Sequence, residues 1–519
     1  MAQASDPRSA PRIDPRTPVI VGAGQCLDRG RQASGSREPV AMMVQALRRA
    51  GADSGAGERL LRRADSVRCV PVIGWRYPAA AALVAEDLGL RPRDTAQSAE
   101  IGGDGPLVLI NDTARAILAG RLEVALLAGA EAVASVRAAR RQGRALAWRQ
   151  QDEQARPSQT LGDARAPVND AEQGAGLMPP VFMYALIENA LRATLRREPE
   201  AHLERIAELW ARFSRVAAEN PCAWIKRAYS PAQIATPSHD NRLVASPYTK
   251  LLTANIDVNM ATGLIVTRGR AARAAGVPLE RWVFVHAGAQ AQDEWHVSER
   301  HALAASPAIR ALGAAALRHT GRAIDEIAHI DLYSCFPAAV EVAAGELGLD
   351  CEDARRPLTV TGGLTFAGGP GNNYASHAVA RLIELLRADA DAYGLASAVG
   401  WYLTKHALSV FSARPPGKPF ASFFPDPRRA PARRALRDHA GPATLEAYTV
   451  TYGRDGTPEA ALISALTARG ERAVMRSGRR EVIDALLAAD PLGWSVKLGA
   501  GERLTLELAG PELPVAARE

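Results

Sequence analysis

Four side chains in the second half of the chain are candidates for moving protons. Tyr333 follows a predicted strand, and His406 follows the last predicted core strand. Tyr374 and His377 lie one helical turn apart, just after a glycine-rich loop. An imidazole titrates near neutral pH, and a phenol acts as a general acid or base when its pKa is lowered. These side chains predict proton transfer at loop ends; the alternative for each is a packed, hydrogen-bonded side chain.

The cysteines and the other histidines indicate neither a catalytic thiol nor a metal site. Cys335 is expected to be a buried, inert thiol. The five Cys form no C-x-x-C pair, which argues against a disulfide framework and a structural zinc site. His296 and His301 have Glu294 and Glu299 nearby, but this spacing is expected of a solvated helix face. We therefore expect no bound metal.

One pattern occurs twice along the chain and predicts two related α/β halves. In each copy a glycine loop opens a helix, and a strand of small and apolar residues follows. The first copy has its loop at 102–105, its helix at 106–119 and its strand at 124–130; the second has them at 368–371, 372–387 and 393–400. Self-similarity in a fixed order is typical of repeated structural units. Because the first helix is apolar on nearly all sides, we expect it to lie between layers.

Shifts in composition predict the domain boundaries. Residues 1–16 are polar and Pro-rich and are expected to form a flexible tail. We expect a first half over 17–281 with a loop domain at about 133–255, a second half over 282–414, a linker over 415–439 and a C-terminal domain over 440–519. Alternating segments and one short amphipathic helix in the last region predict a small β-barrel.

Bulk composition narrows the class of protein. The 519 residues carry a net charge of +7, but no basic stripe with interleaved aromatic residues occurs, so we expect no nucleic-acid partner. A ligand with several phosphates would account for part of the charge. The N-terminus lacks the apolar stretch of a signal peptide, and no apolar run is long enough to span a bilayer. We expect a soluble, cytoplasmic protein without a membrane partner.

Five blocks of sequence, in this order and spacing, resemble the thiolase superfamily between about Thr17 and Ala413. They are PVIVGAGQ, AILAGRLEVALLAGAEA, VNMATGLIVTRGRAARAAG, DLYSCFPAAVEVAAGELGL and GGLTFAGGPGNNYASHAVARL. The resemblance is strongest to sterol-carrier-protein-type thiolases and to thiolase-like proteins named acetyl-CoA acetyltransferases. It implies an α/β thiolase fold of two βαβαβαββ halves in a five-layer αβαβα stack. The C-terminal segment resembles the OB-type barrel attached to some thiolase-like proteins.

The resemblance also implies that the thiolase catalytic side chains are missing. The nucleophilic Cys of the family falls on Gly103, and the second catalytic Cys falls on Ala398. The Asn of the NEAF motif is replaced by Tyr333, and the His of the GHP motif is replaced by Gly369. A thiolase forms a covalent acyl-enzyme on its thiolate. Loss of all four groups argues against that acyl-transfer mechanism.

Backbone groups of the family's site are retained. The N–H groups of Gly103 and Gly400 match the pair that forms the thioester oxyanion hole, and backbone donors polarise a carbonyl without any side chain. The resemblance places further residues in the loops around the pocket, namely Gly102, Asp104, Gly369 and Asn372. Asn372 has the alternative role of capping the second helix.

These features favour an enzyme that acts on an acyl-CoA through an enolate. The concrete hypothesis is a retro-aldol cleavage of a β-hydroxyacyl-CoA in lipid or steroid side-chain metabolism, with Tyr333 and either Tyr374 or His377 moving the proton. CoA would enter as part of the substrate, and no separate cofactor is expected. Some thiolase-fold aldolases use paired tyrosines, which Tyr333 and Tyr374 resemble.

Two other functions remain open. A non-catalytic acyl-CoA or lipid carrier would explain the missing side chains directly. An acyltransferase with an atypical mechanism would need a different nucleophile. The sequence also leaves open whether the protein forms a homodimer.

Overall fold

The two predicted halves share one continuous sheet in the computed structural model, which describes residues 13–30, 36–499 and 506–508. Residues 1–12 of the expected tail, and 500–505 and 509–519 of the expected C-terminal domain, lie outside the described residues. The sheet has eleven strands. Its two parts meet where Val19 pairs with Phe284 and Ile20 pairs with Val283.

Each half contributes a contiguous set of strands to this sheet. The first half supplies, in spatial order, β1 (Pro18–Leu27), β8 (Asn259–Arg268), β4 (Val124–Ala132), β2 (Ser66–Cys69), β3 (Asp94–Ser98) and β5 (Gln159–Leu161). The second supplies β9 (Val283–Gln292), β12 (Lys405–Ser412), β11 (Tyr393–Gly400) and β10 (His329–Asp331), with β13 (Ala421–Phe423) beside β9. Four of the eleven strands, β2, β4, β11 and β12, are buried along their whole length, and β8 is buried except at Arg268, which explains their runs of small and apolar residues.

The two predicted inner helices lie between the two parts of the sheet. They are α4 (Gly105–Leu118) and α14 (Tyr374–Ala388), and each packs on strands of both halves. Twelve of the 14 residues of α4 are buried, as its apolar composition predicts. The paired glycine loops therefore deliver two helix N-termini to the interior of the molecule.

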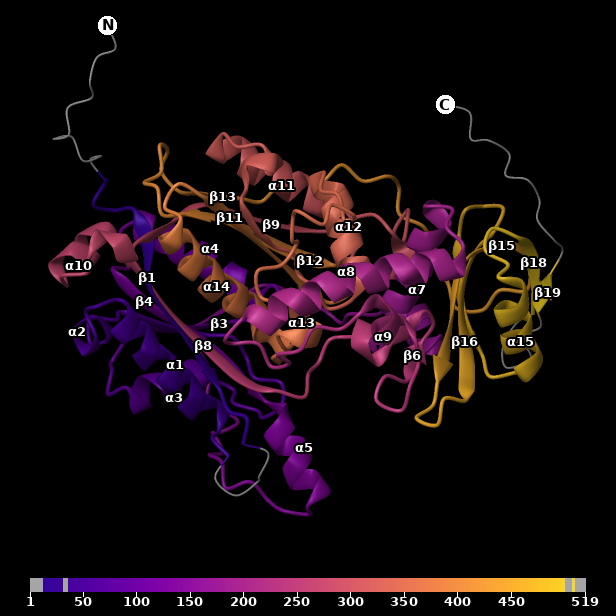
Figure 1. The fold of residues 1–519 in the computed structure, drawn as a ribbon, viewed down its shortest axis with the longest axis horizontal. Helices are drawn as coiled ribbons and strands as arrows, with labels where there is room; N and C mark the ends of the chain where they lie inside the picture. Colours follow the sequence, from indigo (N-terminus) through magenta and orange to yellow (C-terminus); the bar gives the residue numbers. More distant parts are fainter. Residues whose placement is uncertain (1–12, 31–35, 500–505, 509–519) are drawn as a thin grey trace, which may run out of the picture.

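Outer helices complete the layers (Figure 1). On the first half, α1 (Pro39–Asp53) covers β1, β8 and β4, with α2 (Glu58–Leu61) and α3 (Ala80–Asp87) beside it, and α10 (Gly269–Ala274) packs on β8 and β1. On the second half, α11 (Pro307–Thr320) covers β9 and β12 and packs on α12 (Pro337–Leu347). Outer helix, sheet, inner helices, sheet and outer helix make up the five-layer αβαβα stack of the thiolase fold, which confirms the predicted fold.

A mostly helical region lies between β4 and β8 of the first half. It contains α5 (Val133–Arg141), α6 (Asp170–Gly174), α7 (Pro180–Thr194), α8 (Pro199–Glu219) and α9 (Pro231–Ala235), followed by the short strands β6 (Leu243–Ala245) and β7 (Tyr248–Thr249). The short helix α13 (Gly363–Phe366) of the second half packs on α8. Within the described residues, no helix is both long and apolar enough to cross a membrane.

The C-terminal region forms a separate small sheet with one helix. Its strands are β14 (Ala435–Leu436), β15 (Gly441–Tyr452), β16 (Pro458–Leu466), β17 (Arg472–Ser477), β18 (Ser495–Leu498) and β19 (Leu506–Leu508), and its helix is α15 (Arg480–Ala489). The order β14-β17-β16-β15-β18-β19 is open within the described residues, so the closed OB barrel stays a prediction. The helix covers a separate apolar core, which includes Leu445, Ile463, Val482 and Leu486.

This small β domain is joined to the rest of the molecule by a strand pairing and by the hydrogen bonds of a buried arginine. Figure 1 shows its sheet at one end of the molecule, beside α7. Thr451 of β15 pairs with Ala245 of β6, which extends the small sheet into the helical region. The fully buried Arg472 bonds the carboxylate of Glu446 and also donates 3.0 Å to the carbonyl oxygen of Ser298 in the thiolase-fold body. Two short segments of the expected linker over 415–439 form strands: β13 pairs with β9, and β14 pairs with β17.

Candidate active site

Four loops from both halves meet at the N-terminus of α4. Residues 100–104 follow β3, residues 332–336 follow β10, residues 367–373 precede α14, and residues 401–404 connect β11 to β12. In an α/β sheet, loops that leave the ends of neighbouring strands lie together and carry binding groups. The sequence-predicted site residues belong to these loops or to the ends of the adjoining strands, except Tyr374 and His377, which lie in the first turn of α14.

Gly103 is in close contact with Tyr333. A Cβ placed on Gly103 would overlap the Tyr333 hydroxyl, and it would lie 2.5 Å from the ring carbon Cζ and 2.6 Å from the carbonyl oxygen of Val399. Real Cβ atoms do not approach other atoms this closely. The phenol of Tyr333 therefore fills the space into which a side chain at position 103 would project.

The protonation state of Tyr333 restricts its chemistry. Tyr333 is 6% exposed, and burial, together with the nearby Cys335 and Asp104, raises its pKa well above the usual value. The phenol is therefore protonated at neutral pH and can donate a hydrogen bond or a proton. It is a poor base, which narrows the general acid or base role predicted from sequence.

A buried ion pair lies beside Gly103. Lys405 Nζ is 3.4 Å from Asp104 Oδ1, and both side chains are at most 8% exposed. The ammonium also donates to the carbonyl oxygens of Ile101 at 2.9 Å and Asp163 at 3.2 Å. Lys405 thereby fixes the loop that carries Gly103. Asp104 Oδ1 accepts no hydrogen bond from the described residues and is held by the ion pair with Lys405.

Sequence reasoning missed Lys405. Its only signal is a lysine that opens an otherwise apolar, β-forming segment, Lys405–Ser412. An isolated lysine at a strand end is normally solvated, since it can extend its ammonium into water. Here the carboxylate of Asp104 comes from a residue about 300 positions earlier, and no local pattern in the sequence joins the two.

Gly400 packs against this ion pair, and a strained turn follows it. A Cβ on Gly400 would overlap Asp104 Oδ1 and lie 2.5 Å from Lys405 Cε. In the turn, Trp401 and Leu403 have φ of 59° and 55°, which is costly for bulky residues. Tyr184 of α7 stabilises the turn, because its hydroxyl donates to the Trp401 carbonyl oxygen at 3.0 Å and accepts from the Leu403 N–H at 3.1 Å.

Asn372 connects two of the loops. Its Oδ1 accepts from the N–H of Gly102 at 2.8 Å, and its Nδ2 donates to the carbonyl oxygens of Pro71 and Glu100. Its side chain therefore joins loops and makes no capping hydrogen bond to α14. Gly369 lies in the same loop and donates its N–H to the carbonyl oxygen of Asn255 at 2.8 Å. The four predicted loop residues thus lie in contacting or adjacent loops around α4.

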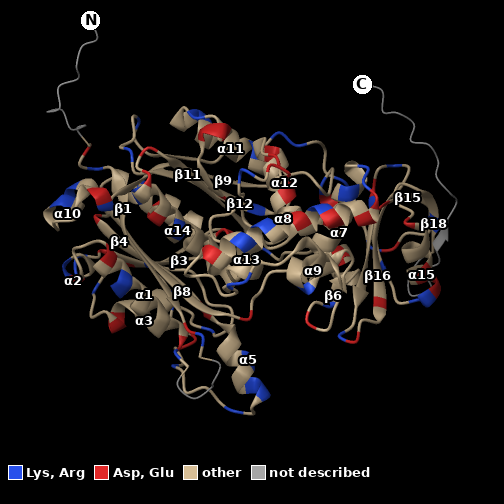
Figure 2. Cartoon of the chain, viewed as in Figure 1, with Lys and Arg blue, Asp and Glu red and all other residues tan. Residues whose placement is uncertain are grey.

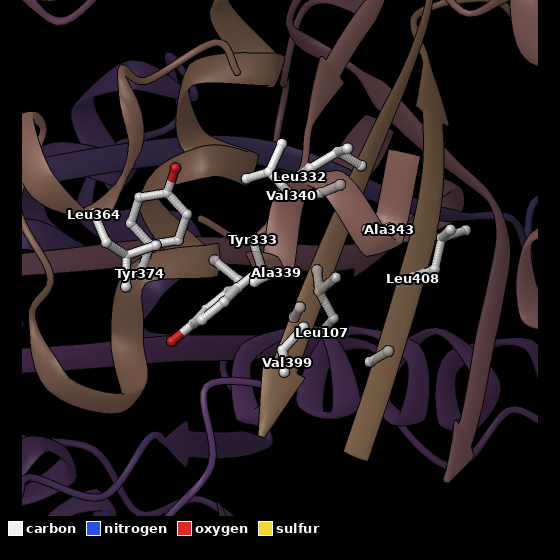
Figure 3. Packing of buried hydrophobic residues seen from close by; sticks show 14 of the residues in the cluster. Leu107, Leu332, Tyr333, Ala339, Val340, Ala343, Leu364, Tyr374, Val399 and Leu408 are labelled. Atoms are coloured by element: carbon white, nitrogen blue, oxygen red, sulfur yellow. The ribbon is translucent and has the colours of Figure 1, made fainter. Parts of the chain in front are cut away.

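Tyr374 packs against Tyr333, but its hydroxyl points elsewhere. The ring centroids are 5.5 Å apart in an edge-to-face arrangement, and Figure 3 shows the two hydroxyls pointing away from each other. The Tyr374 hydroxyl lies 2.6 Å from Thr361 Oγ1 and donates to Asp331 Oδ1 at 3.0 Å. Complete burial of Asp331 raises the pKa of its carboxyl to about 6. This network holds the Tyr374 phenol inside the core.

His377 and His406 are also engaged away from Tyr333. His377 Nδ1 lies 2.8 Å from Gln25 Oε1 on β1, and burial lowers the pKa of the imidazole to about 3. His406 Nε2 lies 3.1 Å from Asp293 Oδ2 and 3.3 Å from Ser306 Oγ, at the N-terminus of α11. Neighbouring side chains on a strand point to opposite faces, so His406 points away from the side on which Lys405 meets Asp104.

Comparisons with known proteins match the C-terminal domain and the fold of this chain. The family model of the thiolase-like protein type 1 additional C-terminal domain matches residues 427–503. The chain is similar to the solved structure of a monomeric SCP2-thiolase like protein type 1 from Mycobacterium smegmatis, with 29% identity, a TM-score of 0.79 and coverage of 96% of this chain and 100% of that chain. The chain is a thiolase-like protein with an additional C-terminal domain.

More distant structures share the fold of this thiolase-like protein. An Ltp2-ChsH2(DUF35) aldolase has 17% identity and a TM-score of 0.57, over 77% of this chain and 99% of that chain. The dimeric peroxisomal thiolase of Saccharomyces cerevisiae has 14% identity and a TM-score of 0.54, over 77% and 98% of the two chains. No curated protein matches in sequence. These two structures match 77% of this chain, whereas the Mycobacterium smegmatis structure matches 96% of it.

Proposed function

We propose that this thiolase-like protein binds an acyl-CoA and cleaves a carbon–carbon bond in the acyl group without forming an acyl-enzyme. The observation that carries the proposal is the position of Tyr333 against Gly103. A nucleophilic side chain at position 103 has no room, and a protonated phenol stands in its place. CoA is part of the substrate in this proposal, and no separate cofactor takes part.

The proposed reaction is a retro-aldol cleavage of a β-hydroxyacyl-CoA. Asp104 takes the proton of the β-hydroxyl group, the Cα–Cβ bond breaks, and the β-carbon becomes a ketone or an aldehyde. The electron pair of the broken bond forms the thioester enolate. The backbone N–H groups of Gly103 and Gly400 hold its oxygen, because fixed donors stabilise charge that develops during the reaction. Tyr333 then protonates Cα and releases the shortened acyl-CoA.

Asp104 replaces Tyr374 and His377 as the partner of Tyr333 in this proposal. Its Oδ1 is buried, faces the Lys405 ammonium at 3.4 Å and accepts no hydrogen bond from the described residues, whereas Tyr374 is hydrogen-bonded to Asp331 and Thr361. The neutral His377 is committed to Gln25. An aldolase among the distant structures with this fold is consistent with the proposed reaction class.

The test is incubation with a series of β-hydroxyacyl-CoA esters, with the products identified by mass spectrometry. We expect a shortened acyl-CoA and a carbonyl product, and the intact protein mass should show no acyl adduct. Tyr333→Phe should lower kcat by about 10²-fold or more, in line with the usual contribution of a general acid. Tyr77→Phe is the matched control, because Tyr77 donates to Glu38 in the outer layer.

Two results would replace the proposal. Binding of the ester with no change in it would favour the non-catalytic carrier, which the low exposure of Tyr333 and Asp104, 6% each, supports. A covalent acyl adduct would instead establish an acyltransferase with an atypical nucleophile. Tyr374→Phe distinguishes the role of Tyr374 from that of Tyr333, because this variant should retain turnover if Tyr374 is only packed against the site.

A further inference from the structure

A second cluster of reactive side chains lies in the helical region, outside the thiolase-type site. Glu188 of α7, His202 of α8 and Glu341 of α12 each offer one ligand atom, and these atoms all lie within 4.8 Å of one another. His202 Nε2 is 2.8 Å from Glu188 Oε1. Two consecutive helices and one helix from the second half of the fold therefore bring two carboxyl groups and an imidazole together.

The cluster is deeply buried, and two of its polar atoms lack a hydrogen-bond partner among the described residues. The side chains of Glu188 and His202 are at most 1% exposed, and that of Glu341 is 10% exposed. Glu341 Oε2 and His202 Nδ1 are buried and have no hydrogen-bond partner among the described residues. A buried polar atom without a partner costs free energy, so each such atom calls for an explanation such as an ion.

A cavity adjoins the cluster. Its volume is about 320 Å³, and Glu341 lies on its wall together with residues of α8, α12 and the loop after α12, including Arg205, Arg212, Glu346, Cys351 and Glu352. Acidic and basic residues alternate along α8 in Figure 2, so the nearby surface has no single sign of charge. The cavity gives room for water or a small ligand next to the two carboxyl groups.

We propose that Glu188, His202 and Glu341 form a site for a divalent metal ion, with Zn²⁺ as the fitting ion. One imidazole and two carboxylates are ordinary zinc ligands, and three protein ligands leave a coordination position open toward the cavity. Two carboxylates also balance the charge of a divalent cation. The imidazole ligand disfavours Mg²⁺ and Ca²⁺, which prefer oxygen ligands. This proposal does not depend on the retro-aldol reaction.

The rival explanation is a closed hydrogen-bond network. Tyr248 donates to Glu188 Oε2 at 2.5 Å, and Arg197 lies 3.7 Å from Glu341 Oε1, where it opposes a cation. Burial raises the pKa of both glutamates, so that one proton is shared between them. A metal ion would displace that proton. The shared proton joins the two glutamates, but the network leaves His202 Nδ1 without a partner among the described residues, which is why we favour the metal site.

The experiment is calorimetric titration of the full-length, chelator-treated protein with ZnCl₂. We expect one Zn²⁺ per chain, with at least about tenfold weaker binding in Glu341→Gln and in His202→Gln. His296→Gln is the control, because His296 lies outside the cluster and pairs with Glu299. An absence of zinc binding, or equal affinity in the two cluster variants and the wild-type protein, would overturn the proposal.

X-ray absorption by the zinc-loaded wild-type protein makes the test independent of variants that fail to fold. The proposal expects one nitrogen and two carboxylate oxygen ligands from the protein. Sulfur in the coordination shell would indicate a cysteine such as Cys351, which is on the cavity wall, and would reject the site.

Discussion

The phenol of Tyr333 occupies the space that a side chain at Gly103 would need: the ring carbon Cζ lies 2.5 Å from the position that a Cβ on Gly103 would take. The two residues come from different halves of the fold, on the loops after β10 and β3. Each therefore limits what the other position tolerates. A residue with a side chain at 103 requires a smaller residue at 333.

The first prediction concerns this packing. Gly103→Ala should lower the free energy of unfolding by about 1–3 kcal/mol, because the new methyl group overpacks the core. Adding Tyr333→Ala should recover part of that loss, with a coupling energy of about 1 kcal/mol or more in a double-mutant cycle. Denaturant unfolding gives both values. Simple additivity of the two changes would contradict the predicted contact.

The control is the same substitution where space is open. Gly345 lies inside α12, and a Cβ there would meet no other atom within 4 Å. Gly345→Ala should stabilise the protein by about 0.5–1 kcal/mol, because glycine loses more backbone freedom in a helix.

The second prediction concerns the buried ion pair. Lys405→Met should cost about 3–5 kcal/mol of stability, because it leaves the carboxylate of Asp104 buried without its partner. In the double variant with Asp104→Asn, the loss should be smaller than in Lys405→Met alone. Chemical denaturation measures each variant. If both variants lost the same stability, Asp104 would have no energetic link to Lys405.

Long-range pairing explains which parts of the site could be predicted from sequence. The strand of Tyr393–Gly400, the helix that follows Gly103 and the loop that carries Asn372 all have local signals, namely periodicity and glycine clusters. The long-range partners of these elements have no such local signal. Lys405 meets Asp104, and Tyr184 meets the Trp401 turn, through contacts that only the folded chain creates. Sequence therefore predicts which loops form the site better than which side chains face each other.

The histidines show the same limit at single-residue scale. His406 has a suitable residue type and lies next to Lys405 in sequence. The alternation of side chains along β12 nevertheless directs it toward Asp293 and Ser306. A strand could be predicted here, but which of its faces points into the site could not.

The third prediction is a pH dependence that originates at Asp331. Its carboxyl has a pKa of about 6 in the folded protein and about 3.8 when unfolded, so the folded state holds its proton longer. Stability from this group is therefore present in full below about pH 4 and falls as the pH rises to about 6, by roughly 3 kcal/mol. Thermal or urea unfolding between pH 4 and 7 measures the slope.

Asp331→Asn supplies the comparison. The amide keeps the shape of the side chain, and its NH₂ group can donate to the Tyr374 hydroxyl, but it cannot ionise. The variant should therefore show a flatter stability profile between pH 4 and 6. An unchanged slope would place the titrating group elsewhere.

The fourth prediction concerns the attachment of the C-terminal domain. Arg472→Met should release this domain from the thiolase-fold body, because it leaves Glu446 without its buried partner and removes the bond to the Ser298 carbonyl. Limited proteolysis should then cut faster between residues 424 and 434. The control is Arg434→Met, since Arg434 is 77% exposed and makes only a surface ion pair with Glu471. Equal cleavage rates in the two variants would exclude the proposed role of Arg472.

Helix α7 contacts three parts of the molecule with residues spaced four apart. Tyr184 holds the turn after Gly400, Glu188 belongs to the Glu–His–Glu cluster, and Arg192 pairs with Asp490 of the C-terminal domain at 2.5 Å. A rigid helix transmits a small axial shift along its length. If the proposed Zn²⁺ ion and the proposed acyl-CoA both bind, an ion that favours one setting of α7 would change the affinity for the acyl-CoA, and by reciprocity the acyl-CoA would change the affinity for the ion. The helix makes the protein a candidate for allosteric coupling between its ends.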